Sequence, residues 1–167
     1  MAGRRTARGW ATSPISPPTK AGWLYLAVVM DLSSRRIVGW SMSERMKADL
    51  VCDAVKSAYW RRKPPAGLLM HTDRGSQYAS EIHRRLLKDY QIIQSMGRKG
   101  NCWDNSAMES FFKTLKVELV YSQPYATRVQ ARLDIVSWSE GFYNAERLHS
   151  SIGYMTPIDA EWGLMAA

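Results

Sequence analysis

The chain has 167 residues, of which 46% are hydrophobic and 23% are charged, enough for one domain with a buried core. Its net charge of +8 and pI of about 9.7 favour an anionic partner such as nucleic acid. The two cysteines lie far apart and lack zinc-ligand spacing, which argues against a structural metal or a disulfide framework. The longest apolar stretch is only strand-sized, so we expect a cytoplasmic protein without a membrane segment.

The first predicted strands form a hairpin. Residues 1–21 are basic and proline-rich without regular periodicity, so we expect an irregular arm there and a single core domain over residues 22–167. Trp23–Met30 and Arg36–Met42 are largely apolar runs joined by a polar turn, which predicts an antiparallel hairpin. We expect Asp31, in this turn, to cap its own backbone.

Helices and strands alternate after the hairpin. Hydrophobic spacing predicts helices over Lys47–Arg62, Ser80–Tyr90, about Asn105–Val120 and about Thr127–Ala145, and strands over Leu68–Thr72 and Gln91–Ser95. A hairpin followed by this alternation predicts an α/β fold in which helices flank a mixed sheet.

A carboxylate stands at the end of one predicted strand. Leu68–Thr72 is mostly apolar, Asp73 follows it directly, and a polar turn with Gly75 comes next. A side chain at the carboxyl end of a buried strand is held rigidly where ligands can reach it, which suits a metal ligand. We expect the nearby His71 to be a buried, hydrogen-bonded residue rather than a ligand.

A second carboxylate, Glu109, lies in a predicted helix, and 35 residues separate it from Asp73. Lys113 and Lys116 share its exposed face, whereas an apolar stripe covers the opposite face. An i,i+4 surface ion pair with Lys113, worth about 0.3 to 0.5 kcal/mol, is the simple alternative. Two divalent ions in phosphodiester chemistry require several carboxylates from separate elements, so this pair is an incomplete set.

Four groups of residues together form a family pattern. They are His71-Thr72-Asp73-Arg74-Gly75-Ser76-Gln77-Tyr78, Arg98-Lys99-Gly100-Asn101-Cys102-Trp103-Asp104-Asn105 with Glu109-Ser110-Phe111-Phe112, Tyr25–Leu32 with Ile37–Trp40, and Tyr143-Asn144 with Arg147, His149 and Gly153–Pro157. From about Gly22 to Trp162 the chain thus resembles the DDE transposases of bacterial insertion sequences, relatives of retroviral integrases. The resemblance implies a ribonuclease H-like fold that cuts and joins DNA strands with Mg²⁺ or Mn²⁺, with two ions in an intact relative.

The resemblance also implies which residues act. Asp73 and Glu109 become the catalytic and metal-binding pair. The candidates for DNA contact, chosen for charge, amide or aromatic character, are Arg98, Lys99, Asn101, Trp103, Asn105, Lys113, Lys116, Arg147 and His149. Alternatives stay open for three of these residues, because Asn105 also suits a helix N-cap, and Arg147 and His149 also suit packing. The expected partners are element-end and target DNA, with a homo-oligomer assembled on the DNA.

The first aspartate of the family is missing. Relatives carry Trp-x-x-Asp-Ile-Thr-Tyr-Ile-Pro-Thr, and the matching stretch here begins at Trp10 and has Ser13 in the place of the aspartate. A neutral hydroxyl leaves the repulsion between two dications uncompensated. Pro14 and Pro17 also remove backbone donors from the expected strand. We therefore expect little or no activity from this chain.

A shifted reading frame would explain this departure. With suitable wobble bases, the codons for Trp10–Pro18, read two bases late, encode Gly-Asp-Ile-Thr-Tyr-Ile-Pro-Thr. The hypothesis is that residues before about Thr19 are a frameshifted translation, and the nucleotide sequence tests it. We also expect the upstream helix-turn-helix region of such transposases to be missing. The alternatives are a non-catalytic DNA-binding or dimerising remnant and a ribonuclease H-like nuclease that only hydrolyses.

Overall fold

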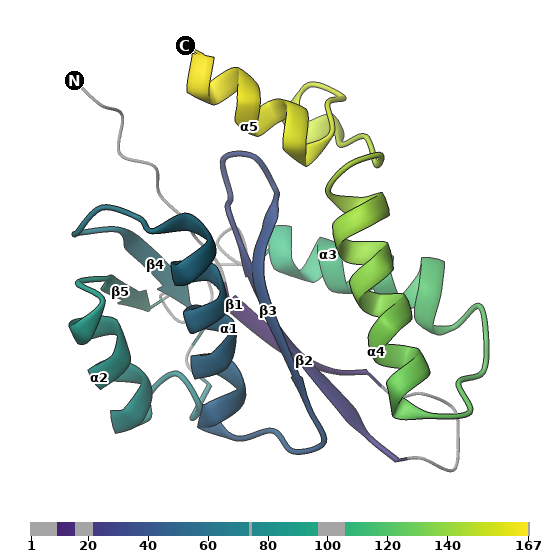
Figure 1. Ribbon diagram of the computed structural model, residues 1–167, viewed down its shortest axis with the longest axis horizontal. Helices are drawn as coiled ribbons and strands as arrows, with labels where there is room; N and C mark the ends of the chain where they lie inside the picture. The colour runs from purple at the N-terminus through teal and green to yellow at the C-terminus, as the bar shows by residue number, and fades with distance from the viewer. Residues whose placement is uncertain (1–9, 16–21, 74, 97–105, 167) are drawn as a thin grey trace.

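The computed structural model describes residues 10–15, 22–73, 75–96 and 106–166 (Figure 1). Its strands form an antiparallel three-stranded sheet and a parallel pair. The sheet has the order β1-β2-β3, with β1 at Trp10–Ile15, β2 at Leu24–Met30 and β3 at Ile37–Ser43; the pair joins β4 at Leu69–Thr72 to β5 at Ile93–Met96. The mixed α/β architecture predicted from the sequence is thus confirmed.

The β2–β3 hairpin is confirmed, including the role of its turn aspartate. Oδ1 of Asp31 accepts hydrogen bonds from the backbone N–H groups of Ser33 at 2.8 Å and Ser34 at 3.4 Å. The backbone N–H of Asp31 donates to the carbonyl of Arg36 at 2.8 Å and closes the turn. The Asp31 side chain therefore organises the hairpin.

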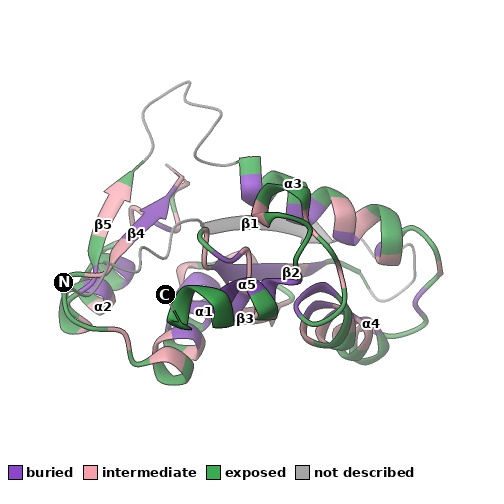
Figure 2. Cartoon of the chain, turned by 90° about the horizontal axis from the view of Figure 1, so that it is seen from above, coloured by how far each residue is buried: buried purple, intermediate pink, exposed green. Residues whose placement is uncertain are grey.

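Strand β2 is buried on both faces. Its alternate residues Leu24, Leu26, Val28 and Met30 belong to a core shared with two later helices, whereas Ala27 and Val29 pack with helix α1 (Ala48–Arg62). Gly39 on β3 permits the close approach of α1, because an added Cβ would lie 2.6 Å from the Cβ of Ala58. Helix α1 and a later helix, α3 (Ser106–Leu115), therefore lie on opposite sides of the sheet (Figure 2).

The parallel pair adjoins the larger sheet. Strand β4 contacts β1, and helix α2 (Glu81–Asp89) connects β4 to β5. The hydroxyl of Ser80 caps α2 by accepting from the backbone N–H of His83 at 3.3 Å. The alternation of strand and helix expected from the sequence is thus present in β4, α2 and β5.

Two long helices complete the core, and each continues into a π-helical turn. Helix α3 (Ser106–Leu115) continues into η1 (Lys116–Val120), and α4 (Arg128–Val136) continues into η2 (Ser137–Tyr143). Their buried residues, including Met108, Phe111, Leu115, Ile135 and Tyr143, pack on β2. The sequence predicted both helices but not the change of helical pitch.

The C-terminal segment was not predicted as regular structure. A 3₁₀ turn, η3 (Ser150–Ile152), precedes helix α5 (Pro157–Ala166). The buried carboxylate of Glu161 on α5 forms ion pairs with Arg36 and Arg62, which join α5 to the hairpin and α1. Within the described ranges, no helix is both long and apolar enough to cross a bilayer.

The expected irregular arm requires a correction. Residues 10–15 form β1, which pairs along its length with β2, and Ser13 lies opposite Leu26 in the register. Pro14 is tolerated because β1 is an edge strand of this sheet, where one side of the backbone needs no ladder partner. Residues 1–9 and 16–21 of the predicted arm, including Pro17, lie outside the described residues.

Candidate active site

The Asp73 carboxylate is held in place directly after β4. Its Oδ1 accepts a 2.7 Å hydrogen bond from the backbone N–H of Gly75, and the residue is half-buried. A Cβ at position 75 would lie 2.9 Å from that same oxygen, closer than real Cβ contacts allow. A larger residue at position 75 would therefore displace this carboxylate, so glycine allows the position that Asp73 takes at the end of the strand.

Gln94 on β5 supports the same turn. Its Nε2 donates to Oγ1 of Thr72 at 3.0 Å and to the carbonyl of Tyr78 at 3.2 Å. That carbonyl also lies 3.1 Å from Nδ1 of the buried His83, and burial lowers the pKa of this histidine despite the opposing effect of the hydrogen bond. The sequence analysis missed Gln94, whose only signal was a polar residue inside a short predicted strand.

His71 lies on β4 two residues before Asp73. It is buried, with 9% of its surface exposed, in agreement with the expected packing role. The neighbouring Thr72 is fully buried. Asp73 therefore follows the buried end of β4 and is itself partly exposed to solvent.

Glu109 is exposed in the first turn of α3. The apolar stripe predicted for this helix is present, because Met108, Phe111 and Leu115 are fully buried. Lys113 is exposed on the last turn of α3, and Lys116 is half-buried where η1 begins. The helix thus presents a carboxylate and a cation on its solvent side, as expected from the spacing.

Strand β1 connects these two elements. It contacts both β4, which ends next to Asp73, and α3, whose first turn carries Glu109. Ser13 lies in the middle of this strand. Across the described ranges, no cluster of three or more histidine, cysteine or acidic side chains suited to a metal is formed.

Five predicted DNA-contact residues fall in the loop between β5 and α3. They are Arg98, Lys99, Asn101, Trp103 and Asn105, and all lie outside the described residues. Their contribution, including the N-cap alternative for Asn105, stays a prediction.

Arg147 and His149 have packing partners. Nη2 of Arg147 donates to Oε1 of Glu118 on η1 at 3.0 Å. The ring of His149 packs against the buried Tyr143 ring in a T-shaped arrangement, with centroids 4.7 Å apart. Burial lowers the pKa of His149, and the nearby Arg147 and Arg35 lower it further, so the ring is neutral at pH 7. These contacts account for both residues without DNA.

Asn144 is a second residue that the sequence analysis missed as a contact. Its Oδ1 accepts from the backbone N–H of Ile37 at 2.9 Å, and its Nδ2 donates to the Ile37 carbonyl at 3.0 Å. The side chain is buried and satisfies both backbone groups of a residue at the start of β3. It anchors the C-terminal segment to the hairpin, and its presence in the family signature was the one available signal.

Comparisons of the sequence identify related proteins. The profile of a family described as "Integrase core domain" matches residues 10–102, and a second profile with that description matches residues 90–157. Transposase InsF for insertion sequence IS3A of Escherichia coli strain K12 is 46% identical over 152 residues, covering 91% of this chain and 53% of the relative. The transposase of insertion sequence element IS904 of Lactococcus lactis is 48% identical over 144 residues, covering 86% and 57%. The chain spans about half the length of these relatives.

Solved structures share the fold. The HTLV-2 integrase catalytic core domain in complex with magnesium superposes with a TM-score of 0.68 at 15% identity, covering 94% of this chain and 95% of that one. The catalytic core domain of BIV integrase gives 0.67 at 19% identity, covering 98% and 97%. The chain therefore belongs to the integrase core domain family and has its ribonuclease H-like fold.

Proposed function

We propose that this domain is built for metal-dependent cleavage and joining of DNA strands, with Asp73 and Glu109 as its acidic residues. The contact of β1 with both β4 and α3 carries the proposal. It brings three positions of the family motif, 13, 73 and 109, onto adjoining elements although they are distant in the sequence. Reactions at a phosphodiester require acidic ligands gathered from separate elements in this way.

The two acids fit one divalent cation better than two. Both residues reach solvent, and the Gly75 amide orients one oxygen of Asp73. Oxygen ligands of this kind suit Mg²⁺ or Mn²⁺, which binds with a few carboxylates and retains several waters. The HTLV-2 integrase core was solved with magnesium, which supports a divalent cation here as well. The neutral Ser13 occupies the position where the family has its third carboxylate, so the set of ligands for a second ion is incomplete.

Each acidic residue has a separate task in this proposal. When bound, the divalent cation activates the attacking oxygen of water or a DNA 3′-hydroxyl and offsets charge on the leaving oxygen. Asp73 fixes the site to the end of β4, where the Gly75 amide limits its rotation. Glu109 closes the site from α3, whose burial against β2 fixes the position of its first turn.

The basic residues near Glu109 would hold the DNA backbone. Lys113 is exposed on the same helix, and Lys116 follows one turn later. Cations beside an acidic site reduce its repulsion of phosphates, and their contribution weakens with salt. Arg98, Lys99, Asn101, Trp103 and Asn105 are proposed for the same role from the adjoining loop. Arg147 and His149 contribute only if DNA displaces their present contacts.

Ser13 makes this chain an impaired member of the family in our proposal. The frameshift hypothesis explains the serine together with the surrounding prolines, and only the nucleotide sequence tests it. The same residue favours a second candidate function, in which the chain is a non-catalytic DNA-binding or dimerising remnant. A remnant would bind DNA without any gain of cleavage when the carboxylate is restored.

The test is to restore the carboxylate. Ser13→Asp is compared with the natural chain for Mn²⁺-dependent nicking of supercoiled DNA and for joining of oligonucleotide ends. We expect nicking to rise at least about tenfold, because the new carboxylate offsets the repulsion between two cations. Adding Asp73→Asn to Ser13→Asp must abolish the gain, whereas adding Asp49→Asn, on the exposed first turn of α1, must not. An unchanged rate in Ser13→Asp, with the fold intact, would favour the remnant.

A further inference from the structure

The start of strand β2 carries a pair of stacked aromatic rings. Trp23, which directly precedes β2, is 54% exposed, and its ring centroid lies 6.4 Å from that of Tyr25 with an angle of 23° between the two planes. Tyr25 is partly buried against the core on the α1 side of the sheet. The anchored tyrosine therefore holds a large apolar ring in place at the surface, where it can stack against another planar group.

A guanidinium group lies beside this aromatic pair. Gly22 has a φ of +82°, and a Cβ at this position would lie 2.9 Å from Nη2 of Arg128, the first residue of α4. Nη1 of Arg128 forms an ion pair with Oε1 of Glu44 at 2.7 Å. Glycine at position 22 therefore allows both the left-handed backbone and the approach of Arg128 to the segment that carries Trp23.

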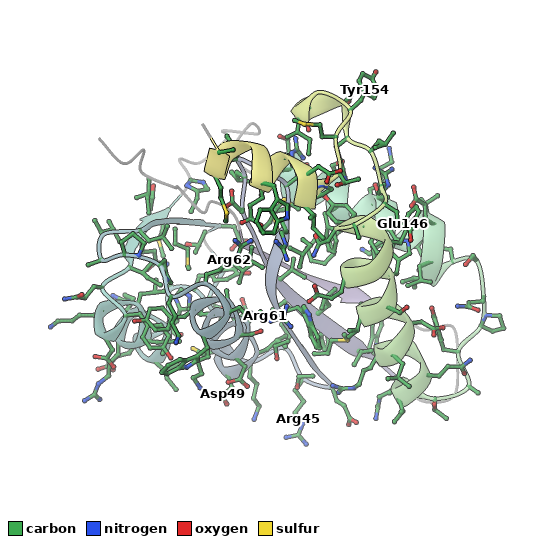
Figure 3. All side chains as sticks on the ribbon, turned by 45° about the horizontal axis from the view of Figure 1, so that its top comes forward. Arg45, Asp49, Arg61, Arg62, Glu146 and Tyr154 are labelled. Carbon is green, nitrogen blue, oxygen red and sulfur yellow. The ribbon has the colours of Figure 1, made fainter. Side chains whose placement is uncertain are left out.

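Further cations lie at the same end of the β2–β3 hairpin. Arg132 follows one turn later on α4, and its Nη1 donates to the carbonyl of Met42, a neutral acceptor, at 2.9 Å. Arg45 and Lys47 come just after β3 and are exposed, and their side chains form no hydrogen bond or ion pair with the residues that the structure describes. Figure 3 shows the side chain of Arg45 extending into solvent.

The acidic groups at this end are fewer than the cations. Among the described residues there, Glu44 is already paired with Arg128, and Asp49 lies in the exposed first turn of α1 (Figure 3). An exposed aromatic ring flanked by cations is the arrangement with which proteins bind single-stranded nucleic acid, because the ring stacks on a base and the cations hold the adjoining phosphates. The net charge of +8 favours the same class of ligand.

We propose that Trp23 stacks on an unpaired base of single-stranded DNA, and that Arg45, Lys47 and Arg128 hold the phosphates on either side of that base. We call these four residues, with Tyr25, the β2 platform. The inference rests on the proposed function, because DNA is the substrate on which that function acts. A cut or frayed DNA end suits the platform best, since its bases are already unpaired and no further unstacking energy is needed.

The β2 platform is separate from the acidic site but close to it along the sheet. Ser13 lies opposite Leu26, three residues from Trp23, which corresponds to about 10 Å along a strand. Leu26 packs in the core shared with α3, whereas Tyr25 packs on the α1 side, so the platform does not include the metal site. A single strand of DNA spans such a distance with a few nucleotides.

The test measures binding of a single DNA strand of about 12 nucleotides that contains one 2-aminopurine, in EDTA so that no metal takes part. The natural chain should quench the 2-aminopurine fluorescence. Trp23→Ala should weaken binding about tenfold and abolish the quenching, whereas Trp23→Phe should retain both. Arg45→Gln should lower the slope of log affinity against log salt concentration by about 0.7. Glu44→Gln should tighten binding about threefold, because it frees Arg128 for a phosphate.

Matched controls separate the platform from general effects of aromatic and charged residues. Trp162→Ala removes a ring that is 64% exposed on α5, and it should leave affinity and quenching unchanged. Arg85→Gln, at an exposed position on α2, should leave the salt slope unchanged, and circular dichroism checks the fold of every variant. A natural chain that does not bind the single strand, or that binds blunt duplex equally tightly, would overturn the proposal, as would unchanged binding in Trp23→Ala. These results are obtained without metal, so they are distinct from a failure of Ser13→Asp to nick DNA, which counts against the proposed function.

Discussion

The backbone N–H of Gly75 lies 2.7 Å from Oδ1 of Asp73, and the same glycine leaves no space there for a Cβ. Gly75 thus orients the Asp73 carboxylate through its N–H, and its lack of a side chain leaves room for that carboxylate. We predict that Gly75→Ala lowers Mn²⁺ affinity about tenfold, because the new methyl group displaces the carboxylate. Calorimetric titration measures the affinity, and circular dichroism checks the fold. Unchanged affinity would show that the turn does not position Asp73 for a metal.

Asn144 should be important for stability. Asn144→Ala leaves the buried N–H and carbonyl of Ile37 without side-chain partners, which should cost about 2 to 4 kcal/mol of unfolding free energy. Urea denaturation followed by fluorescence measures this loss. Gln130→Ala, on the exposed face of α4, serves as the control and should change stability by less than about 0.5 kcal/mol. An equal effect of the two substitutions would contradict the anchoring role.

The docking of α5 should depend on pH through Glu161. Burial raises the pKa of this carboxyl, but hydrogen bonds and charges from Arg62 and Arg36 outweigh burial and leave the pKa below its usual value of 4.5. A lowered pKa in the folded state gives stability that is present above the unfolded pKa and is lost as the pH falls through the folded pKa. Acidification below about pH 4 should therefore weaken the attachment of α5.

Glu161→Gln tests this dependence. The variant should be less stable than the natural chain at pH 7, and the difference should shrink as the pH falls from about 5 to about 3. Chemical denaturation at several pH values measures the difference. Glu146→Gln, at an exposed position without an ion pair to the described residues, should show no such convergence.

Two glycine substitutions should have opposite effects. In Gly39→Ala the new Cβ would lie 2.6 Å from both the Cβ and the backbone nitrogen of Ala58, so β3 and α1 must separate, at a cost of about 1 to 3 kcal/mol or more. In Gly163→Ala the Cβ meets nothing within 4 Å, and alanine favours the helix by about 0.5 to 1 kcal/mol. Thermal unfolding distinguishes them. A stabilised Gly39→Ala would contradict the close packing of α1 on the sheet.

Local patterns predicted the central elements. The apolar run before Asp31 and the one after the turn predicted the β2–β3 hairpin, and the amphipathic spacing around Glu109 predicted α3, because each pattern matches the period of its element. Helix α5 escaped prediction because its large apolar residues Trp162, Leu164 and Met165 are exposed and form no regular stripe. Strand β1 was not predicted because Pro14 argues against a central strand, whereas an edge strand tolerates a proline.

The candidate site likewise contains one residue that a local pattern predicts and others that no local pattern predicts. Asp73 followed from a local signal, an apolar strand ending at a glycine turn. Gln94 and Asn144 depend on partners far along the chain, and Asn144 meets Ile37 across 107 residues, so no local pattern indicates either contact. Whether Asp73 and Glu109 share one ion stays a prediction, as do the DNA contacts of the loop before α3.

Mn²⁺ titration followed by electron paramagnetic resonance tests the central claim most directly. If Asp73 and Glu109 ligate the same ion, Asp73→Asn and Glu109→Gln should each remove the same single tight site, and the double variant should lose no more than either one. Two independent losses that add in the double variant, or tight binding retained in both single variants, would contradict a shared site.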